Sequence, residues 1–174
     1  MVEGQTAQAG VQEGKSPAIN PRSGARLAVV QALYDMDISG KGVLDALAEF
    51  EAHWIGREID GIVHPPAETA FFRDLLRGVV DEQRAIDPQL DAALSQGWPL
   101  RRIETVLRAI LRAGAYELMF RPDVPARAAI SQYVDVTHSF YNADEPGLVN
   151  AVLDRLARQV RPDEVSDKPG AKRG

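Results

Sequence analysis

The sequence predicts an all-α protein with a single folded domain of about seven helices. Apolar residues recur at spacings of three and four along most of the chain, as they do on one face of a helix. No stretch shows the sustained alternation of apolar and polar residues that is typical of a half-buried strand. The chain has 174 residues, of which 45% are hydrophobic and 26% charged. This length and composition suit one packed domain.

Both ends of the chain are predicted to be disordered tails. Residues 1–21 are rich in Gly, Gln, Ala and Ser and contain few large aliphatic side chains. Such a segment buries too little apolar surface to offset the entropy lost on ordering. Residues 161–174 have the same character. The folded domain is therefore expected over residues 22–160.

Three helices are predicted in the amino-terminal half. Their apolar positions, helix by helix, are Leu27, Val30, Leu33 and Tyr34, then Leu44, Leu47, Phe50 and Trp54, then Phe71, Phe72, Leu75, Leu76, Val79 and Val80. Between the second and third helices, residues 55–66 contain two Gly and two Pro. We expect this segment to form an exposed loop, the longest inside the domain.

Four further helices are predicted in the carboxy-terminal half, at residues 86–94, 103–118, 130–140 and 149–160. Pro88, Pro99 and Pro125 stand near expected helix starts, where proline removes no helical hydrogen bond. The connections between these helices are short. Short connections favour an antiparallel bundle.

The charge distribution limits the kinds of partner. A formal net charge of −5 excludes a strongly basic nucleic-acid binder, so any affinity of the lone chain for RNA is expected to be modest. Six arginines nevertheless fall between residues 99 and 127. Three of them, Arg101, Arg108 and Arg112, share one side of the helix predicted at 103–118, together with Glu104. This cationic stripe indicates either a surface for a polyanion or acidic partner, or an ordinary solvated helix face.

No catalytic, metal or cofactor site is predicted. The three histidines are far apart, and no phosphate-binding loop or nucleophile elbow is present. The chain contains no cysteine, and its apolar runs are too short to span a bilayer. We therefore expect a cytoplasmic, non-enzymatic protein without a membrane segment.

Some side chains could be either structural or functional. Glu117 falls near the apolar side of its predicted helix, and a buried carboxylate needs partners. We expect it to cap the helix that begins near Pro125, with a binding role as the alternative. The aromatic residues could either pack in the core or stack on RNA bases; they are Tyr34, Phe120, Tyr133, Phe140 and Tyr141.

Several blocks of the sequence resemble the bacterial NusB family of transcription antitermination factors. They are ILRAGAYEL at 110–118, DVP at 123–125, AI at 129–130 and LVNAVLD at 148–154, together with parts of 25–34 and 72–79. The resemblance implies an all-helical fold of two small subdomains. It also implies binding of boxA-containing single-stranded RNA together with ribosomal protein NusE, within an RNA polymerase antitermination complex. Monomer and homodimer both remain open.

The resemblance also implies site residues. The positions that match RNA contacts of the family are Arg22, Arg26, Gln31, Asp144 and Asn150. The positions that match the NusE surface are Tyr34, Arg108 and Arg112. The family's amino-terminal arginine-rich element is reduced here to its two ends, Arg22 and Arg26. Leu107 stands where the family usually has an acidic residue facing NusE, and Leu148 replaces a common Phe. We therefore expect fewer RNA contacts and a need for the second protein.

Two alternatives remain. The first is a helical protein-interaction module without RNA affinity, which would use the acidic amino-terminal half as its surface. The second is an accessory domain of an RNA methyltransferase, because NusB-like domains precede such enzymes. A chain that ends at Gly174 leaves no room for a cofactor-binding α/β domain, so we do not expect the second.

Overall fold

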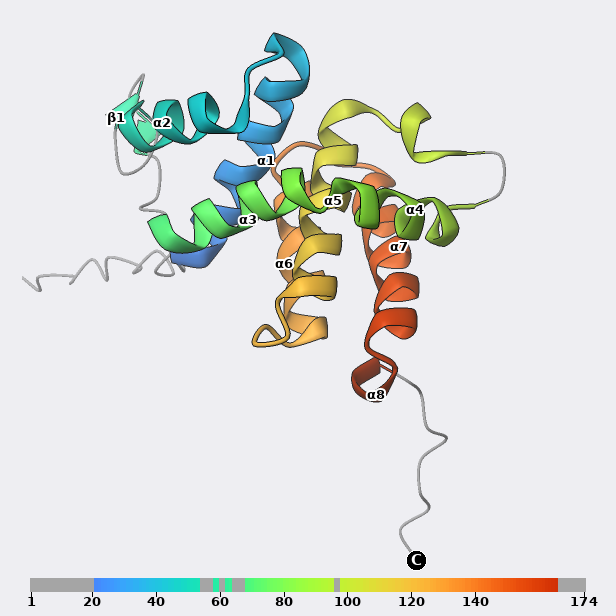
Figure 1. Ribbon diagram of the computed structural model, residues 1–174. Coiled ribbons are helices and arrows are strands. Elements are labelled where there is room, and N and C mark those ends of the chain that lie inside the picture. Colours follow the sequence, from blue (N-terminus) through green and yellow to red (C-terminus); the bar gives the residue numbers. More distant parts are fainter. Residues whose placement is uncertain (1–20, 54–57, 60–61, 64–67, 96–97, 166–174) are drawn as a thin grey trace, which may run out of the picture.

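The computed structural model describes residues 21–53, 58–59, 62–63, 68–95 and 98–165. The elements, in chain order, are α1 (Pro21–Ser39), α2 (Val43–His53), β1 (Glu58–Ile59), β2 (Ile62–Val63), α3 (Thr69–Asp81), α4 (Gln83–Ala93), the 3₁₀-helix η1 (Leu100–Arg102), α5 (Thr105–Phe120), α6 (Ala126–His138), α7 (Glu145–Val160) and α8 (Pro162–Val165). The all-α fold class predicted from the sequence is confirmed (Figure 1).

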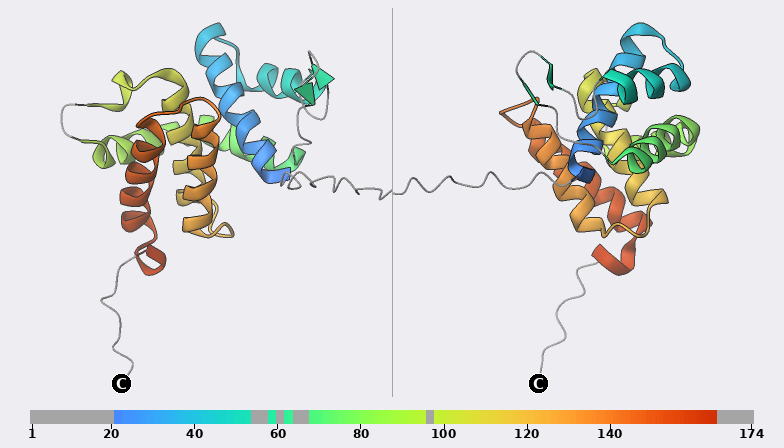
Figure 2. Two further views of the ribbon diagram at one scale, coloured as in Figure 1. Left: turned by 180° about the vertical axis from the view of Figure 1, so that it is seen from behind. Right: turned by 90° about the vertical axis from the view of Figure 1, so that its left-hand side faces the viewer.

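Helix α5 lies at the centre of the fold. Ten of its sixteen residues are buried, and they occur on almost every side of the helix, as expected for a helix surrounded by others. It packs against α1 and α3 on one side and against α4, α6 and α7 on the other. Helices α6 and α7 run side by side in Figures 1 and 2, and α2 extends from the α1 and α3 group. The two helical groups therefore share α5, which agrees with the arrangement implied by the resemblance.

Glycine allows two helix pairs to approach closely. A Cβ atom on Gly78 of α3 would lie 2.1 Å from Cζ of Tyr116 on α5. A Cβ atom on Gly114 of α5 would lie 2.7 Å from Cδ1 of Leu153 on α7. Both distances are far below van der Waals contact, so these positions accept only glycine without repacking. The glycines thereby fix how α3 and α7 sit on α5.

Several predicted boundaries change in the structure. Helix α4 begins at Gln83, so Pro88 is its sixth residue rather than a starting residue. Pro99 and Pro125 do immediately precede η1 and α6, as predicted. Helix α5 begins at Thr105, two residues after the predicted start, because the Glu104 side chain accepts hydrogen bonds from the backbone N–H groups of Val106 (3.2 Å) and Leu107 (3.4 Å).

The segment predicted as the longest loop contains a short hairpin. Strands β1 and β2 pair antiparallel, with Glu58 opposite Val63 and Ile59 opposite Ile62. The exposure expected for this segment lies outside the described residues, as does the predicted amino-terminal tail except for Pro21, which begins α1. None of the helices in the described ranges is long and apolar enough to cross a membrane.

The predicted carboxy-terminal boundary at residue 160 is five residues too early. Arg161 is only 9% exposed and Val165 only 1%. Residues 162–165 form α8, which packs against α6 and α7. The folded part of the chain therefore includes residues 161–165, and residues 166–174 lie outside the described residues.

Candidate nucleic-acid interface

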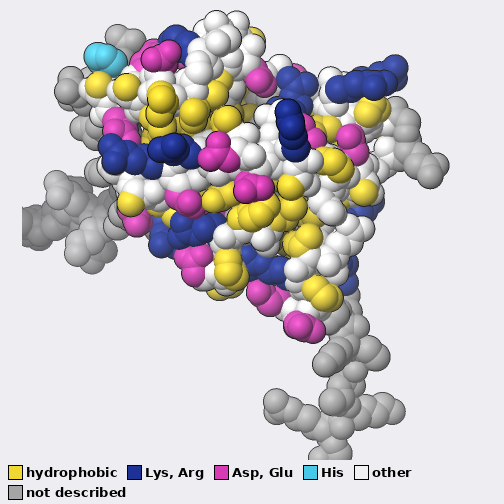
Figure 3. Space-filling model, in the orientation of Figure 1, with side chains coloured by type: hydrophobic (Ala, Val, Ile, Leu, Met, Phe, Trp, Pro, Cys, Tyr) yellow, Lys and Arg dark blue, Asp and Glu magenta, His cyan; other side chains and the backbone are white. Residues whose placement is uncertain are grey.

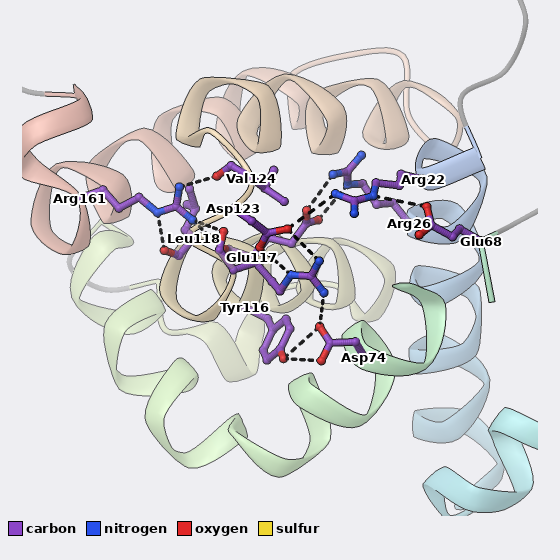
Figure 4. A network of polar contacts seen from close by, with 11 residues as sticks. Arg22, Arg26, Glu68, Asp74, Tyr116, Glu117, Leu118, Asp123, Val124 and Arg161 are labelled. Carbon is purple, nitrogen blue, oxygen red and sulfur yellow. Dashed lines mark hydrogen bonds and ion pairs between the residues drawn. The ribbon is translucent and has the colours of Figure 1, made fainter. Parts of the chain in front are cut away.

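Arg26 and Glu117 form a buried ion pair that joins α1 to α5. Nε of Arg26 donates to Oε2 of Glu117 (2.9 Å), and Nη2 donates to Oε1 (2.8 Å). The Arg26 side chain is 5% exposed and the Glu117 side chain is fully buried. Figure 4 shows the two side chains pointing toward each other between the helices. The RNA contact predicted for Arg26 does not fit this position, because its guanidinium is buried and both hydrogen bonds go to Glu117.

The capping role predicted for Glu117 is wrong, because its carboxylate is occupied by Arg26. The cap on α6 comes instead from α8, where Oε2 of Glu164 accepts the backbone N–H of Ala126 (2.9 Å). The neighbouring Tyr133 is fully buried beside the pair. Burial, and then the negative charge of Glu117, raise the pKa of Tyr133 well above its usual value.

Arg161 binds the carboxy-terminal end of α5. Its guanidinium donates to the carbonyl oxygens of Leu118 (2.8 Å), Glu117 (2.8 Å) and Arg121 (2.6 Å), and also to that of Val124. The carbonyls of Glu117 and Leu118 belong to the last turn of α5, where few backbone N–H groups remain to bond them. Those of Arg121 and Val124 belong to the following loop. Backbone N–H groups also reach the carbonyls of Glu117 (from Arg121, 3.0 Å) and Arg121 (from Val124, 3.1 Å). Arg161 is therefore a structural residue that the sequence analysis had placed in a tail.

Arg22 lies at the edge of a second polar cluster around Phe71. Its side chain is 36% exposed, and its Nε lies 3.4 Å from Oε2 of Glu68. The Arg22 guanidinium also stacks over the Phe71 ring at 4.6 Å. Among the arginines predicted to contact RNA, Arg22 is the one that remains accessible at the amino-terminal end of α1.

Arg121 joins the remaining residues of this cluster. Its guanidinium donates to Asp74 on α3 (2.8 Å) and to Asp123 (2.9 and 3.0 Å). Asp74 also accepts the hydroxyl of Tyr116 (3.2 Å). Burial, followed by the Asp74 charge, raises the pKa of Tyr116 to about 12. These charges neutralise one another, so this cluster does not present a basic surface.

A hollow of about 420 Å³ lies between α1, α2, α5 and the end of α6. It is lined by Val30, Gln31, Tyr34, Asp35, Glu49, Phe50, Val106 and Phe140. Tyr34 is 40% exposed and Phe140 is 38% exposed. The structure thus brings together two predicted site residues, Gln31 and Tyr34, with an aromatic residue about a hundred positions away in the sequence. An apolar hollow with accessible rings and an amide at its edge suits a planar ligand.

The two arginines predicted to contact NusE are already engaged. The Arg112 guanidinium makes two hydrogen bonds with Asp87 of α4 (2.9 and 3.0 Å), and its side chain is 15% exposed. Nη2 of Arg108 lies 3.4 Å from Oδ2 of Asp37. Leu107, which stands where the family usually has an acidic residue, is 6% exposed and packs in the core. Leu148 is partly buried against the core.

Asp144 lies immediately before α7, and Asn150 lies in the second turn of that helix. Asp144 precedes the helix and is exposed, and its carbonyl accepts the N–H of Leu148 (3.1 Å). Asn150 is exposed in a shallow groove between α6 and α7 that Arg127 and Ser131 also line. Asn150 therefore borders a different depression from the one that holds Gln31 and Tyr34.

The residue missed when the site was predicted is Phe140. The sequence predicted only an aromatic residue that either packs in the core or stacks on RNA. Its position after the last turn of α6 could have suggested exposure, because Phe140 and Tyr141 fall where the apolar helical spacing ends. That Phe140 would lie beside α1 could not be inferred without knowing how the helices pack.

Comparison with known proteins identifies the fold and its relatives. The NusB family model matches residues 23–158. The transcription antitermination protein NusB of Bradyrhizobium sp. (strain ORS 278) is 55% identical over 97% of this chain and all of that protein. The NusB protein of Rhodopseudomonas palustris (strain HaA2) is 59% identical over 83% of this chain and 86% of that protein.

Solved structures agree with this assignment. The structure of T. maritima NusB superposes with a TM-score of 0.68 at 26% identity, covering 83% of this chain and 96% of that one. The match to the family model extends over most of the described domain, and the high-identity relatives carry the same family name. The chain therefore belongs to the NusB family of transcription antitermination proteins.

Proposed function

We propose that this protein binds boxA-containing single-stranded RNA together with ribosomal protein NusE, as a non-enzymatic, cytoplasmic adaptor of the RNA polymerase antitermination complex. A crystal structure of the antitermination factors NusB and NusE with double-stranded RNA shares this fold, with a TM-score of 0.65 at 24% identity, over 81% of this chain and 98% of that one. The observation that carries the proposal is the hollow between α1 and the end of α6, with the accessible rings of Tyr34 and Phe140.

The chemistry of this hollow fits unpaired bases. Single-stranded RNA is recognised through bases that stack on aromatic rings and form hydrogen bonds along their edges. Tyr34 and Phe140 offer the rings, and Gln31 offers an amide that both donates and accepts. Two further accessible polar residues are proposed to contact the RNA outside the hollow: Arg22 at the amino-terminal end of α1, and Asn150 in the groove between α6 and α7. Asp144 would repel phosphate and lower the affinity.

The charge of the protein explains why a second protein is needed. The net charge is −5, and Arg26, Arg112 and Arg121 are all paired with carboxylates. On the face shown in Figure 3, basic and acidic side chains are interleaved rather than gathered into one basic field. Because phosphate neutralisation supplies most sequence-independent affinity, the RNA must gain contacts from NusE.

The proposed surface for NusE lies at the outer end of α1. Tyr34 and Arg108 border it, and two aliphatic side chains are exposed there, Ile38 (66% exposed) in the last turn of α1 and Leu44 (68% exposed) in the first turn of α2. Large exposed apolar residues that cluster at one place mark protein-binding sites. This observation also supports the alternative of a protein-interaction module without RNA affinity.

Fluorescence-anisotropy titration tests the proposal. A labelled boxA-like RNA and a scrambled RNA are titrated with the protein alone and with its own organism's NusE, over a salt series. We expect selective binding of the boxA-like RNA that tightens when NusE is present. Tyr34→Leu and Phe140→Leu should each weaken RNA binding about 5- to 150-fold, the range found for loss of one base–aromatic stack.

Phe120→Leu is the matched control. Phe120 is a similarly exposed aromatic (36%) that lies outside the hollow and stacks on Tyr116, so its loss should leave RNA binding unchanged. Binding of NusE without any RNA affinity in the mixture would reject the RNA part of the proposal. That result would favour the protein-interaction module.

A further inference from the structure

The connection between α4 and α5 presents an aromatic and basic surface that the proposed function does not use. Trp98 is 53% exposed, although tryptophan is usually well buried. Arg101 and Arg102 of η1 are both exposed. Within the described part of the chain, neither guanidinium has a carboxylate partner. Figure 3 shows basic side chains projecting over η1 at the upper right of the molecule.

The backbone beneath these side chains is held firmly. Leu100 and Ile103 are 2% and 4% exposed. The Leu100 N–H donates to Oδ1 of Asp91 (2.7 Å), and the Arg102 N–H donates to the carbonyl of Pro99 (2.9 Å). Because a 3₁₀-helix has three residues per turn, Leu100 and Ile103 share the buried side. The two arginines between them consequently project into solvent from a fixed position.

These side chains differ from the other arginines of the same region. Arg108 and Arg112 lie close to Asp37 and Asp87, respectively, and are partly buried. Arg101 and Arg102 therefore provide the positive charge that is not neutralised locally. Guanidinium groups bind phosphate through paired hydrogen bonds, and an exposed indole stacks on bases or holds a cation. Arginines next to an accessible aromatic ring fit single-stranded nucleic acid.

The same segment is continuous with the hollow. Nη1 of Arg108 donates to the carbonyl of Arg101 (3.4 Å). The Glu104 side chain, two residues after η1, accepts the hydroxyl of Tyr141. Val106 then lines the hollow itself, which Phe140 closes on the other side. One strand of RNA can thus pass from the hollow along the start of α5 to η1.

We propose that Trp98, Arg101 and Arg102 form a second RNA contact, which binds nucleotides that flank those held at the hollow. The inference rests on the proposed function, because it concerns the same RNA strand. It predicts that the length of RNA bound by this chain exceeds the segment at Tyr34 and Phe140. It also predicts that this added length contributes through charge and stacking rather than through sequence.

The test compares a boxA-like RNA with the same RNA extended by about four nucleotides at either end, a length that a binding surface of this kind can hold. Titrations use the full chain with NusE over a salt series. Wild-type protein should bind one of the extended RNAs at least about fivefold more tightly than the short one. Arg101→Ala with Arg102→Ala should abolish this gain and reduce the salt slope by about 1.4, since each phosphate contact on a single strand contributes about 0.7.

Trp98→Ala should reduce the gain without changing the salt slope, because stacking releases no counterions. Arg77→Ala with Arg84→Ala is the matched control. Both arginines are exposed, on α3 and α4, and their removal changes the net charge by the same amount. All four arginines lie on the surface, so circular dichroism should show the same fold for both double variants.

Three results would overturn the inference. The extended RNAs could bind no more tightly than the short one, the Arg101 and Arg102 variant could keep the gain, or the control variant could lose it equally. In each of these cases the short RNA still binds, and the proposed function stands. If wild-type protein with NusE does not bind the short RNA, the proposed function fails and this inference fails with it.

Discussion

Loss of one partner from the Arg26–Glu117 pair should strongly destabilise the protein. Arg26→Ala leaves the Glu117 carboxylate without its two hydrogen bonds in a site where it has no exposure to water. Removing one member of such a buried pair costs about 3–5 kcal/mol, because the remaining charge is not compensated. Domains of this kind have about 5–15 kcal/mol of stability in all. Arg26→Ala should therefore remove a large share of the free energy of unfolding.

Urea unfolding followed by circular dichroism measures this effect. With a dependence of about 1–3 kcal/mol per molar urea, a loss of about 3–5 kcal/mol should lower the midpoint by roughly 1–5 M. The double variant Arg26→Met with Glu117→Leu removes both charges and keeps most of the volume. Because well-packed apolar residues often replace a buried ion pair without loss, it should recover most of the stability.

The double variant also separates structure from RNA contact. It lacks the Arg26 guanidinium but keeps α1 in place, so its RNA affinity and salt slope should match those of the wild type. Arg22→Ala, at the exposed end of the same helix, should instead reduce the slope by about 0.7. The reasoning is refuted if Arg26→Ala changes stability by less than about 1 kcal/mol. It is refuted equally if the folded double variant has a reduced salt slope, since Arg26 would then contact phosphate.

Three further predictions concern stability. A chain ending at Val160 should lose at least about 3 kcal/mol relative to one ending at Val165, because the carbonyl contacts of Arg161 and the Glu164 bond to Ala126 disappear; equal urea midpoints for the two truncations would contradict this. Gly78→Ala should cost about 1–3 kcal/mol through the Tyr116 ring, whereas Gly147→Ala, with nothing within 4 Å, should be neutral or stabilising in thermal unfolding. The pKa of Tyr116 is raised to about 12 by burial and Asp74, above the value near 10 of an unfolded tyrosine. The contribution of the Tyr116 hydroxyl to the free energy of unfolding is thus complete below about pH 10 and is lost as the pH rises toward about 12. Urea midpoints that stay constant from about pH 9 to about pH 11 would contradict this.

The helices could be predicted from the spacing of apolar residues, because each helix buries one face whose residues recur every three or four positions in the sequence. Phe72, Leu75, Leu76 and Val79 are all buried on α3, as their spacing indicated. Boundaries were predicted less well where a tertiary contact decides them. Pro88 is tolerated inside α4, and Arg161 belongs to the fold because carbonyls at the end of a distant helix need its guanidinium. No local signal in the sequence reports such a contact.

The position of Arg26 could have been inferred from the sequence, since it lies four and seven residues before Val30 and Leu33, on the apolar side of its helix. Glu117 was assigned to an apolar side by the same reasoning. Two opposite charges on the apolar sides of two helices of one bundle indicate a pair, because each otherwise bears the cost of an isolated buried charge. Arg26 was instead predicted to contact RNA, because the resemblance to an arginine-rich element depends on its positive charge and not on the side of the helix that it occupies.

The pairing of buried charges bears directly on how RNA can be bound. Arg26, Arg112 and Arg121 stabilise helix contacts, so their charge is not available to phosphate. The surface presents Arg22, which lies near Glu68 but is partly exposed at one end of α1, the two arginines of η1, and the aromatic hollow beside the start of α5. We expect a chain with this distribution to gain RNA affinity mainly from base stacking, which neutralises no phosphate and so releases no counterions. The salt slope of the protein alone should therefore be shallow, and it should steepen when NusE adds its own basic groups. A steep slope for the protein alone would mean that the paired arginines open to meet the RNA, in which case the buried network would be a part of the binding site rather than its support.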